Sequence, residues 1–302
     1  MSVISTGNNP KALWPGINAW WGRFYNEHPL ECTELFAQET SNKAYEEDVK
    51  ITGFGLAPVK PQGSAVSYDS ETQGAVQRYT HVAYGLGYIV TREERKDNLY
   101  AKVANTRTKA LAFSMRQTKE NVAANVYNRA FTSAYAFSDG KELIATDHPT
   151  LSGNQSNELA TPADLSEASL EDLCIQVADA KNDRGLKISL MPRKLIVATA
   201  NMFEATRILK SAQQSGTANN DINALKAMNM FPDGAMASHY FTDADAYFVL
   251  TNAPEGMKMF TREAIEFTDD GDFDTDNRKY KAYERYSVGC TDWRGIYGSA
   301  GA

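Results

Sequence analysis

Only one short stretch of this sequence places side chains as catalysis would need them. Asp147 and His148 are neighbours just before Pro149, and an acid beside a histidine can orient a general base. Such a base needs a nucleophile to activate, yet no serine lies in a G-x-S-x-G elbow. A capped turn ahead of the proline is the simpler interpretation. A hydrolase that uses Asp147 and His148 is therefore the weakest of three functional hypotheses, and we expect no catalytic residues.

Metal and cofactor sites are equally hard to find in the sequence. Four histidines occur, and no two of them have the spacing of metal ligands: His28, His81, His148 and His239. Three cysteines occur far apart, which fits no disulfide framework and no metal motif: Cys32, Cys174 and Cys290. We expect buried thiols in a reducing compartment. The chain also lacks a phosphate-binding loop ending in G-K-[ST] and a G-x-G-x-x-G turn, so we predict no cofactor and no enzyme.

One run of acidic residues could attract a cation or a basic partner. Five aspartates crowd into eight positions: Asp269, Asp270, Asp272, Asp274 and Asp276. Their order differs from that of an EF-hand loop, because Gly271 comes too early and no closing glutamate follows at the proper place. A solvated turn between strands is the interpretation that we favour. An acidic patch that pairs with a neighbour's basic helix, and a divalent-cation site, are the two alternatives.

The element that must organise these residues is a helix predicted over 91–131. No proline occurs between Pro61 and Pro149, no glycine occurs between Gly87 and Gly140, and helix-forming residues fill the interval. Apolar residues recur at spacings of three, four and their multiples: Leu99, Val103, Ala110, Phe113, Val122, Val126 and Ala130. Such a helix would be about 60 Å long, so other subunits or strands must support it. Its excess of basic residues suits a solvated face, or a surface for nucleic acid or for a partner's acidic loops.

Extended structure is predicted before the long helix. The stretch 82–90 alternates strictly, as a half-buried strand does. Glycines, prolines and polar residues fill 53–77, which predicts a long hairpin tip that needs a surface to lie against. An arm over 1–50 comes first, and it carries clustered aromatic residues: Trp14, Trp20, Trp21, Phe24 and Tyr25. These side chains either fill the protein's own core or pack on a neighbouring subunit, and both interpretations stay open.

An α/β region is predicted after the long helix. It contains helices near 166–182 and over 202–209, buried strands over 195–198 and 247–250, a polar loop over 213–221 and a strand-rich stretch over 257–297. Asn201 is positioned to cap the second of these helices at its N-terminus.

Length, composition and charge limit the class of protein. A chain of 302 residues with 42% hydrophobic residues can bury one large core or two modest ones. The net charge of −7 argues against wholesale wrapping of nucleic acid, although a local basic face could still contact it. The N-terminal stretch lacks the apolar segment of a signal peptide, and no run approaches the roughly 18 apolar residues of a membrane span. We therefore expect a cytosolic product without a membrane partner.

The order of these parts, together with long stretches of sequence, resembles the Mu-like major head protein family of tailed bacteriophages. The stretches that carry the resemblance are 52–69, 79–100, 108–131, 139–153, 209–227 and 272–302. The family has the Hong Kong 97-type capsid fold, so the resemblance implies an α+β subunit with an N-terminal arm, an extended hairpin (E-loop), a peripheral (P) domain and an axial (A) domain.

The resemblance also implies where these parts lie in this chain. They are an N-terminal arm at 1–50, an E-loop hairpin at 51–88, a P-domain with the spine helix at 89–165, an A-domain at 166–254, returning P-domain strands at 255–290 and a C-terminal segment at 291–302. In this fold the E-loop lies over an adjacent subunit, and the A-domain gathers around the hexamer and pentamer axes.

The function implied is that of a major capsid protein of a tailed bacteriophage or prophage. Its copies would form hexamers and pentamers of an icosahedral head that encloses double-stranded DNA, assembled in the host bacterial cytoplasm and located in the virion. The expected partners are a separate scaffold protein, a portal, a possible decoration protein and packaged DNA, contacted non-specifically if at all. The scaffold is expected to be separate because the arm starts at once, whereas several relatives begin with a long scaffolding segment. An encapsulin-like bacterial compartment shell, which shares the fold, is the alternative.

Overall fold

The computed structural model describes residues 21–302 apart from 28, 98–99 and 215–220. The chain divides into two compact units. The described residues of the first unit come from 21–44, Thr80–Ala123 and Met259–Ser287. The second unit consists of Tyr45–Tyr79, Ala124–Lys258 and Val288–Ala302. No helix within the described ranges is both long and apolar enough to cross a bilayer.

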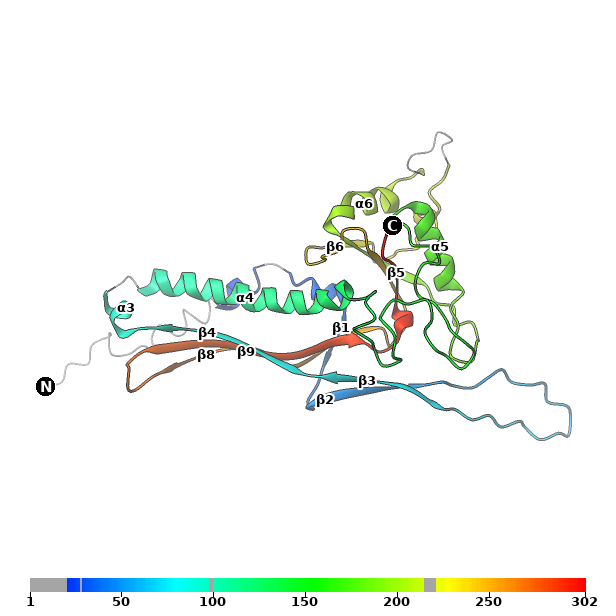
Figure 1. Cartoon of the computed structure of the whole chain (residues 1–302), viewed down its shortest axis with the longest axis horizontal. Helices are drawn as coiled ribbons and strands as arrows, with labels where there is room; N and C mark the ends of the chain where they lie inside the picture. The colour runs from blue at the N-terminus through cyan, green and yellow to red at the C-terminus, as the bar shows by residue number, and fades with distance from the viewer. Residues whose placement is uncertain (1–20, 28, 98–99, 215–220) are drawn as a thin grey trace. The chain divides into compact units, whose positions relative to one another are not determined.

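The first unit is built on a four-stranded sheet covered by a long helix (Figure 1). The strand order is β1 (Ala37–Thr40), β8 (Met257–Gly271), β9 (Arg278–Cys290) and β4 (Val82–Val90). The strands β4 and β9 are antiparallel, with Val82 opposite Tyr286 and Val90 opposite Arg278. The alternation that predicted a strand over 82–90 is confirmed.

Paired tyrosines explain the alternation in β4. Tyr84 stacks on Tyr286 and Tyr88 stacks on Tyr280, with ring centroids 4.8 and 4.9 Å apart. Such cross-strand aromatic pairs stabilise one face of a sheet. Gly87 is required on the same strand, because a Cβ there would lie 2.5 Å from the carbonyl oxygen of Tyr280. The sheet therefore has one aromatic face and one face with small side chains along β4.

The helical stretch predicted over 91–131 is found as α3 (Arg92–Asp97) and α4 (Tyr100–Asn128). The residues between these helices, 98–99, lie outside the described part of the chain. The 29 residues of α4 span about 43 Å. The apolar stripe expected along this helix is only partly correct.

Phe113 shows where the expected stripe is wrong, because 61% of its surface is exposed. The buried face of α4 in the first unit is offset from the predicted one, and it holds Thr108, Leu111, Ala112, Met115, Arg116 and Glu120. A prediction that uses only the spacing of apolar residues cannot identify a buried helix face that also carries polar residues. Two residues of the predicted stripe cannot be compared: Leu99 lies outside the described residues, and so does the side chain of Val103.

The polar residues of α4 hold the segment that precedes β1. The carboxylate of Glu120 accepts hydrogen bonds from the backbone N–H groups of Glu31 (2.7 Å) and Cys32 (2.9 Å), at the start of α2 (Cys32–Leu35). Arg116 donates to the carbonyl oxygen of Pro29. Burial raises the pKa of Glu120, and these two N–H donors oppose that rise. A buried carboxylate thus caps a helix on a segment almost ninety residues away in sequence.

The aromatic residues of the N-terminal segment pack within the first unit where they are described. Trp21 stacks on Phe267 with ring centroids 4.8 Å apart, and Tyr25 stacks on Trp21 at 5.9 Å. Both Trp21 and Tyr25 are buried, so the core interpretation is confirmed for these two residues. Trp14 and Trp20 lie outside the described residues.

The second unit contains another four-stranded sheet, in the order β10 (Ile296–Ser299), β7 (Tyr247–Thr251), β5 (Pro192–Ala198) and β6 (Ala235–Ser238). The strands β5 and β6 are parallel, whereas the other pairs are antiparallel. Helices α5 (Glu167–Ala178), α6 (Met202–Lys210) and α7 (Ala224–Ala227) accompany this sheet. The buried strands predicted over 195–198 and 247–250 are confirmed.

The ends of two helices in this unit differ from the prediction. Helix α5 is capped by Ser166, whose side chain accepts from the N–H of Ser169, and the helix ends at Ala178 rather than near 182. Asn201 does precede α6, but its side chain makes no capping bond there. It donates instead to the carbonyl oxygen of Ala244, because a tertiary partner is within reach.

Replacing Glu120 with alanine should destabilise the unassembled subunit by about 1–3 kcal/mol, because the buried N–H of Cys32 and the partly buried N–H of Glu31 lose their acceptor. Asn121→Ala, at the exposed next position of α4, is the matched control and should change stability by less than about 0.5 kcal/mol. Urea unfolding of both variants measures the difference. Equal midpoints for the two variants would contradict the capping role.

Candidate assembly site

The long hairpin of the second unit is the first part of the candidate site. Strands β2 (Tyr45–Ile51) and β3 (Gln73–Thr80) pair with each other, and no helix or strand forms between them (Figure 1). Thr52 and Thr72 close the paired part, since the N–H of Thr52 donates to the carbonyl oxygen of Thr72 over 3.1 Å. The residues 53–71 then form the hairpin tip, which confirms the prediction for these positions, whereas 73–77 of the predicted tip belong to β3.

The hairpin tip exposes large apolar side chains. The most exposed are Val59 and Tyr68, with 93% of their surface accessible. The full set is Phe54, Leu56, Val59, Val66 and Tyr68. Contiguous apolar surface of this kind marks interaction sites, since water solvates it poorly. The described chain leaves this surface uncovered.

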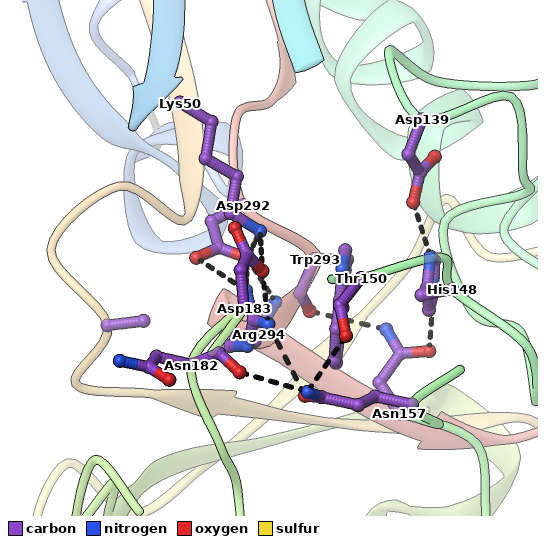
Figure 2. Close-up of polar contacts among 12 residues, drawn as sticks. Lys50, Asp139, His148, Thr150, Asn157, Asn182, Asp183, Asp292, Trp293 and Arg294 are labelled. Carbon is purple, nitrogen blue, oxygen red and sulfur yellow. Dashed lines mark hydrogen bonds and ion pairs between the residues drawn. The ribbon is translucent and has the colours of Figure 1, made fainter. Parts of the chain in front are cut away.

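The root of the hairpin, by contrast, is held by charges that are buried or partly buried (Figure 2). The ammonium of Lys50 on β2 lies 3.2 Å from a carboxylate oxygen of Asp183 and 3.5 Å from one of Asp292. The guanidinium of Arg294 bonds the same two carboxylates, at 2.8 and 3.2 Å. Two cations and two anions therefore compensate one another where the hairpin joins its unit.

Arg294 is the centre of this charge network, because only 2% of its surface is exposed. Its Nε donates to the carbonyl oxygen of Lys181 over 2.7 Å, and its NH2 donates to the Oε1 of Gln155. A buried guanidinium is tolerated only when its donors are satisfied in this way. The one sequence signal for it is an arginine next to Trp293 and two positions before the buried Ile296.

His148 lies in a second set of contacts beside this network (Figure 2). Its Nδ1 is 2.6 Å from the carboxylate of Asp139, its Nε2 is 3.0 Å from the Oδ1 of Asn157, and its ring stacks on Trp293 at 4.4 Å. Asp147 bonds Lys141 instead. The hypothetical pair of Asp147 and His148 is therefore wrong: the histidine is buried, and both of its nitrogens are engaged by other residues.

Asp139 shows the electrostatic effect of this arrangement. Burial alone would raise the pKa of its carboxyl group, but the hydrogen bond from His148 and the N–H of Lys141 outweigh burial and lower the pKa below its ordinary value. The carboxylate is held as an anion that orients the imidazole. The role that this geometry supports is structural, since it braces the loop against Trp293.

A pocket opens between the hairpin root and the loop that carries His148. Its volume is about 220 Å³, and its lining comes from the hairpin (Lys50, Thr52 and Thr72–Ala75), from 137–139, 142–143 and 148–151, and from Asp183, Cys290, Thr291 and Trp293. We call this cavity the hairpin-root pocket. Several of its lining residues are themselves buried, among them Leu143, His148 and Trp293.

The acidic run is a turn between β8 and β9 that forms ion pairs within its own chain. Asp269 bonds Arg278, Asp272 lies 3.0 Å from Lys279, and Asp276 lies 2.8 Å from Arg92. These pairs agree with the solvated turn that we favoured. Phe273 protrudes from it with 99% of its surface exposed. Within the described ranges, no group of three acidic, histidine or cysteine side chains could hold a metal ion.

The remaining histidines and cysteines do not assemble into a site in the described chain. His81 is buried in the first unit between Ser41 (3.1 Å) and Ser287 (3.0 Å), and His28 lies outside the described residues. The three cysteines are unbonded and buried, as expected: Cys32, Cys174 and Cys290. Burial raises the pKa of the Cys32 and Cys174 thiols to about 12, which makes them poor nucleophiles.

Comparison with known proteins identifies the family of this chain and solved structures of similar fold. A family model described as phage capsid protein matches residues 74–299. A structure from Microbacterium phage Oxtober96 is 7% identical and has a TM-score of 0.56, with 91% of this chain and 92% of that chain covered. A virus-like particle from Pyrococcus furiosus is 11% identical at a TM-score of 0.56, with 94% and 98% covered. A structure from Mycobacterium phage Patience is 9% identical at a TM-score of 0.54, with 98% and 88% covered. No curated protein sequence matches the chain.

Replacing Arg294 with methionine should destabilise the subunit by about 3–5 kcal/mol, because Asp183 and Asp292 lose a buried counter-charge. Arg193→Met is the matched control, since the ion pair of Arg193 with Asp233 is half exposed and such pairs contribute about 0–1 kcal/mol. Denaturant midpoints of the unassembled variants compare the two. A small loss at Arg294, equal to that at Arg193, would show that the network does not brace the hairpin root.

Replacing Asp139 with asparagine should lower stability at neutral pH, and this loss should shrink in acid. The pKa of Asp139 is lowered in the folded chain, so its contribution is present above the ordinary value of 3.8 and is lost as the pH falls below it. Thermal unfolding of both proteins from pH 7 to pH 3 tests this. A difference that stays constant over this range would mean that the Asp139 charge contributes nothing.

Proposed function

The chain belongs to the phage capsid protein family, and from this premise we propose how its copies build a shell. It has the Hong Kong 97-type α+β fold, and as a capsid protein it is a structural subunit that assembles into capsomers of a virion. We propose that these capsomers are hexamers and pentamers of an icosahedral tailed-phage head that encloses double-stranded DNA. The closer resemblance to Mu-like head proteins stays a prediction.

We further propose the partners and the division of the chain. A separate scaffold, a portal and a possible decoration protein would act with this subunit in the host cytoplasm, and it would contact DNA non-specifically if at all. The proposed arm, E-loop, P-domain and A-domain follow the ranges predicted above, with the E-loop at 51–88 and the A-domain at 166–254. An encapsulin-like compartment is less well supported, since the family model is that of phage capsids.

The proposal rests on one observation: ion pairs hold the root of the hairpin, whereas the apolar side chains of its tip are exposed. Lys50 is fixed by Asp183 and Asp292, while Val59 and Tyr68 of the tip are almost fully exposed. A segment with this much apolar surface and no cover within its described chain is completed by another molecule. In a closed shell many copies of this contact act together, so each can be weak.

The hairpin tip is tested by replacing 53–71 with Asn-Gly, a two-residue turn that closes a hairpin directly beyond Thr52 and Thr72. The shortened subunit should keep its thermal midpoint but fail to form stable shells with co-expressed scaffold. Light scattering and negative-stain microscopy provide the measurement.

Two full-length variants separate tip chemistry from tip length. One changes the five exposed apolar residues of the tip to serine, and it should fail like the shortened subunit. The control changes Gln62, Ser64 and Ser67 to alanine, and it should assemble normally. Stable shells from the shortened subunit would refute the role of the hairpin as an intersubunit clamp, and an inert monomer from the unaltered chain would refute the capsid proposal.

A further inference from the structure

The hairpin-root pocket is lined by Lys50 and by three acidic residues, one of which has no direct ion pair within the described chain. Of the acids that line it, Asp183 is paired with Lys50 and Arg294, and Asp139 is bonded to His148. Glu142 also lines the pocket, and it forms neither an ion pair nor a side-chain hydrogen bond with any described residue. The rim of the pocket is therefore anionic at this position.

The charge of Glu142 acts on two neighbouring side chains, Glu158 and Lys141. Burial raises the pKa of Glu158, and the charge of Glu142 raises it further. Beside this acidic rim the lining includes Leu143, His148 and Trp293. The Trp293 ring stacks on His148 at 4.4 Å, the guanidinium of Arg294 lies 4.4 Å from its centroid and the ammonium of Lys50 lies 5.8 Å from it. A carboxylate without a direct partner at the edge of a pocket suits a cation on an apolar stem.

The hairpin tip offers such a group. Lys60 is the only basic residue between Gly53 and Thr72, and its side chain has no partner among the described residues. It follows the exposed Val59 and precedes Pro61, whose fixed φ restricts the backbone of this part of the tip. The cation is therefore presented on a protruding and partly stiffened loop.

We infer that Lys60 of one copy inserts into the hairpin-root pocket of a neighbouring copy and pairs with Glu142. This inference rests on the proposed function and specifies the partner of the hairpin tip. The stem of the lysine would enter the pocket beside Leu143, and its ammonium would meet the carboxylate of Glu142. The pocket volume of about 220 Å³ is sufficient for a single side chain of this size.

The contact is heterologous, because the tip and the pocket are different surfaces of the same chain. Contacts of this kind repeat from one copy to the next and close into rings when the rotation allows it, as a capsomer requires. The other protruding group, Phe273, is a poorer occupant. It is flanked by Asp272 and Asp274, which Glu142 would repel.

A disulfide between the two positions tests the contact directly. Shells with both Lys60→Cys and Glu142→Cys should form intersubunit disulfides on mild oxidation, seen as a ladder of multimers on non-reducing gels. Cys290 lines the pocket, so it is changed to serine in every variant of this test, and the other two native cysteines are buried and should add little background. The control pairs Lys60→Cys with Glu204→Cys, a partly exposed position on α6, and it should give no ladder above that of the single variants.

Charge reversal tests the same pair without a cross-link. Lys60→Glu and Glu142→Lys should each lower the yield of shells severalfold at low salt, whereas the double variant should recover most of the yield of the unaltered chain. Lys60→Arg should assemble normally. Thermal midpoints of the unassembled variants check that each subunit still folds.

The outcomes separate the inference from the proposed function. If the unaltered chain forms shells but the Lys60–Glu142 ladder does not exceed its control, the pocket contact is wrong and the capsid function stands. If Lys60→Glu weakens assembly and Glu142→Lys does not restore it, Lys60 binds another surface and the inference is again wrong. If the unaltered chain forms no shells under any condition, the proposed function fails and the inference fails with it.

Discussion

The burial of Arg294 is the constraint on which the hairpin and its surroundings depend. A guanidinium without solvent requires full compensation, and here it draws in Asp183, Asp292, Gln155 and a backbone carbonyl from separate parts of the second unit. Lys50 shares two of these carboxylates, so the first strand of the hairpin is tied to the same centre. The direction of the hairpin within its unit is thus a consequence of charge balance.

The two ends of the hairpin differ in whether their side chains have partners within the same chain. At the root, each charge of the network has a partner within one chain, which favours a single arrangement of the backbone. At the tip, apolar side chains such as Val59 and Tyr68 are in water and no described residue covers them. The hairpin therefore has all of its charge partners where it joins its own subunit, and its tip has apolar surface that another subunit would cover. A capsid protein needs both properties, because the shell must form from subunits that are already folded.

Buried polar groups play a similar part in the first unit. Glu120 and Arg116 lie on the inner face of α4, where an apolar residue would be expected, and they bond the backbone of the segment that contains Pro29, Glu31 and Cys32. This is why the inner face of the helix could not be identified by apolar spacing, and why Phe113 is on the outside. Directed hydrogen bonds hold the chain before β1 in one position, which apolar packing alone would leave less specific.

The sequence by itself determined the elements whose cause is local. The alternation over 82–90, the buried strands at 195–198 and 247–250, the glycine- and proline-rich tip, and most of the long helix all follow from periodicity and backbone preference among near neighbours. The tertiary structure alone decided the contacts that make the site. Arg294 and Asp183 are 111 positions apart, and His148 takes Asp139 rather than the adjacent Asp147. The strength of an ion pair depends on the distance between the two charged groups and on their exposure to solvent. Both quantities are fixed only when the chain folds.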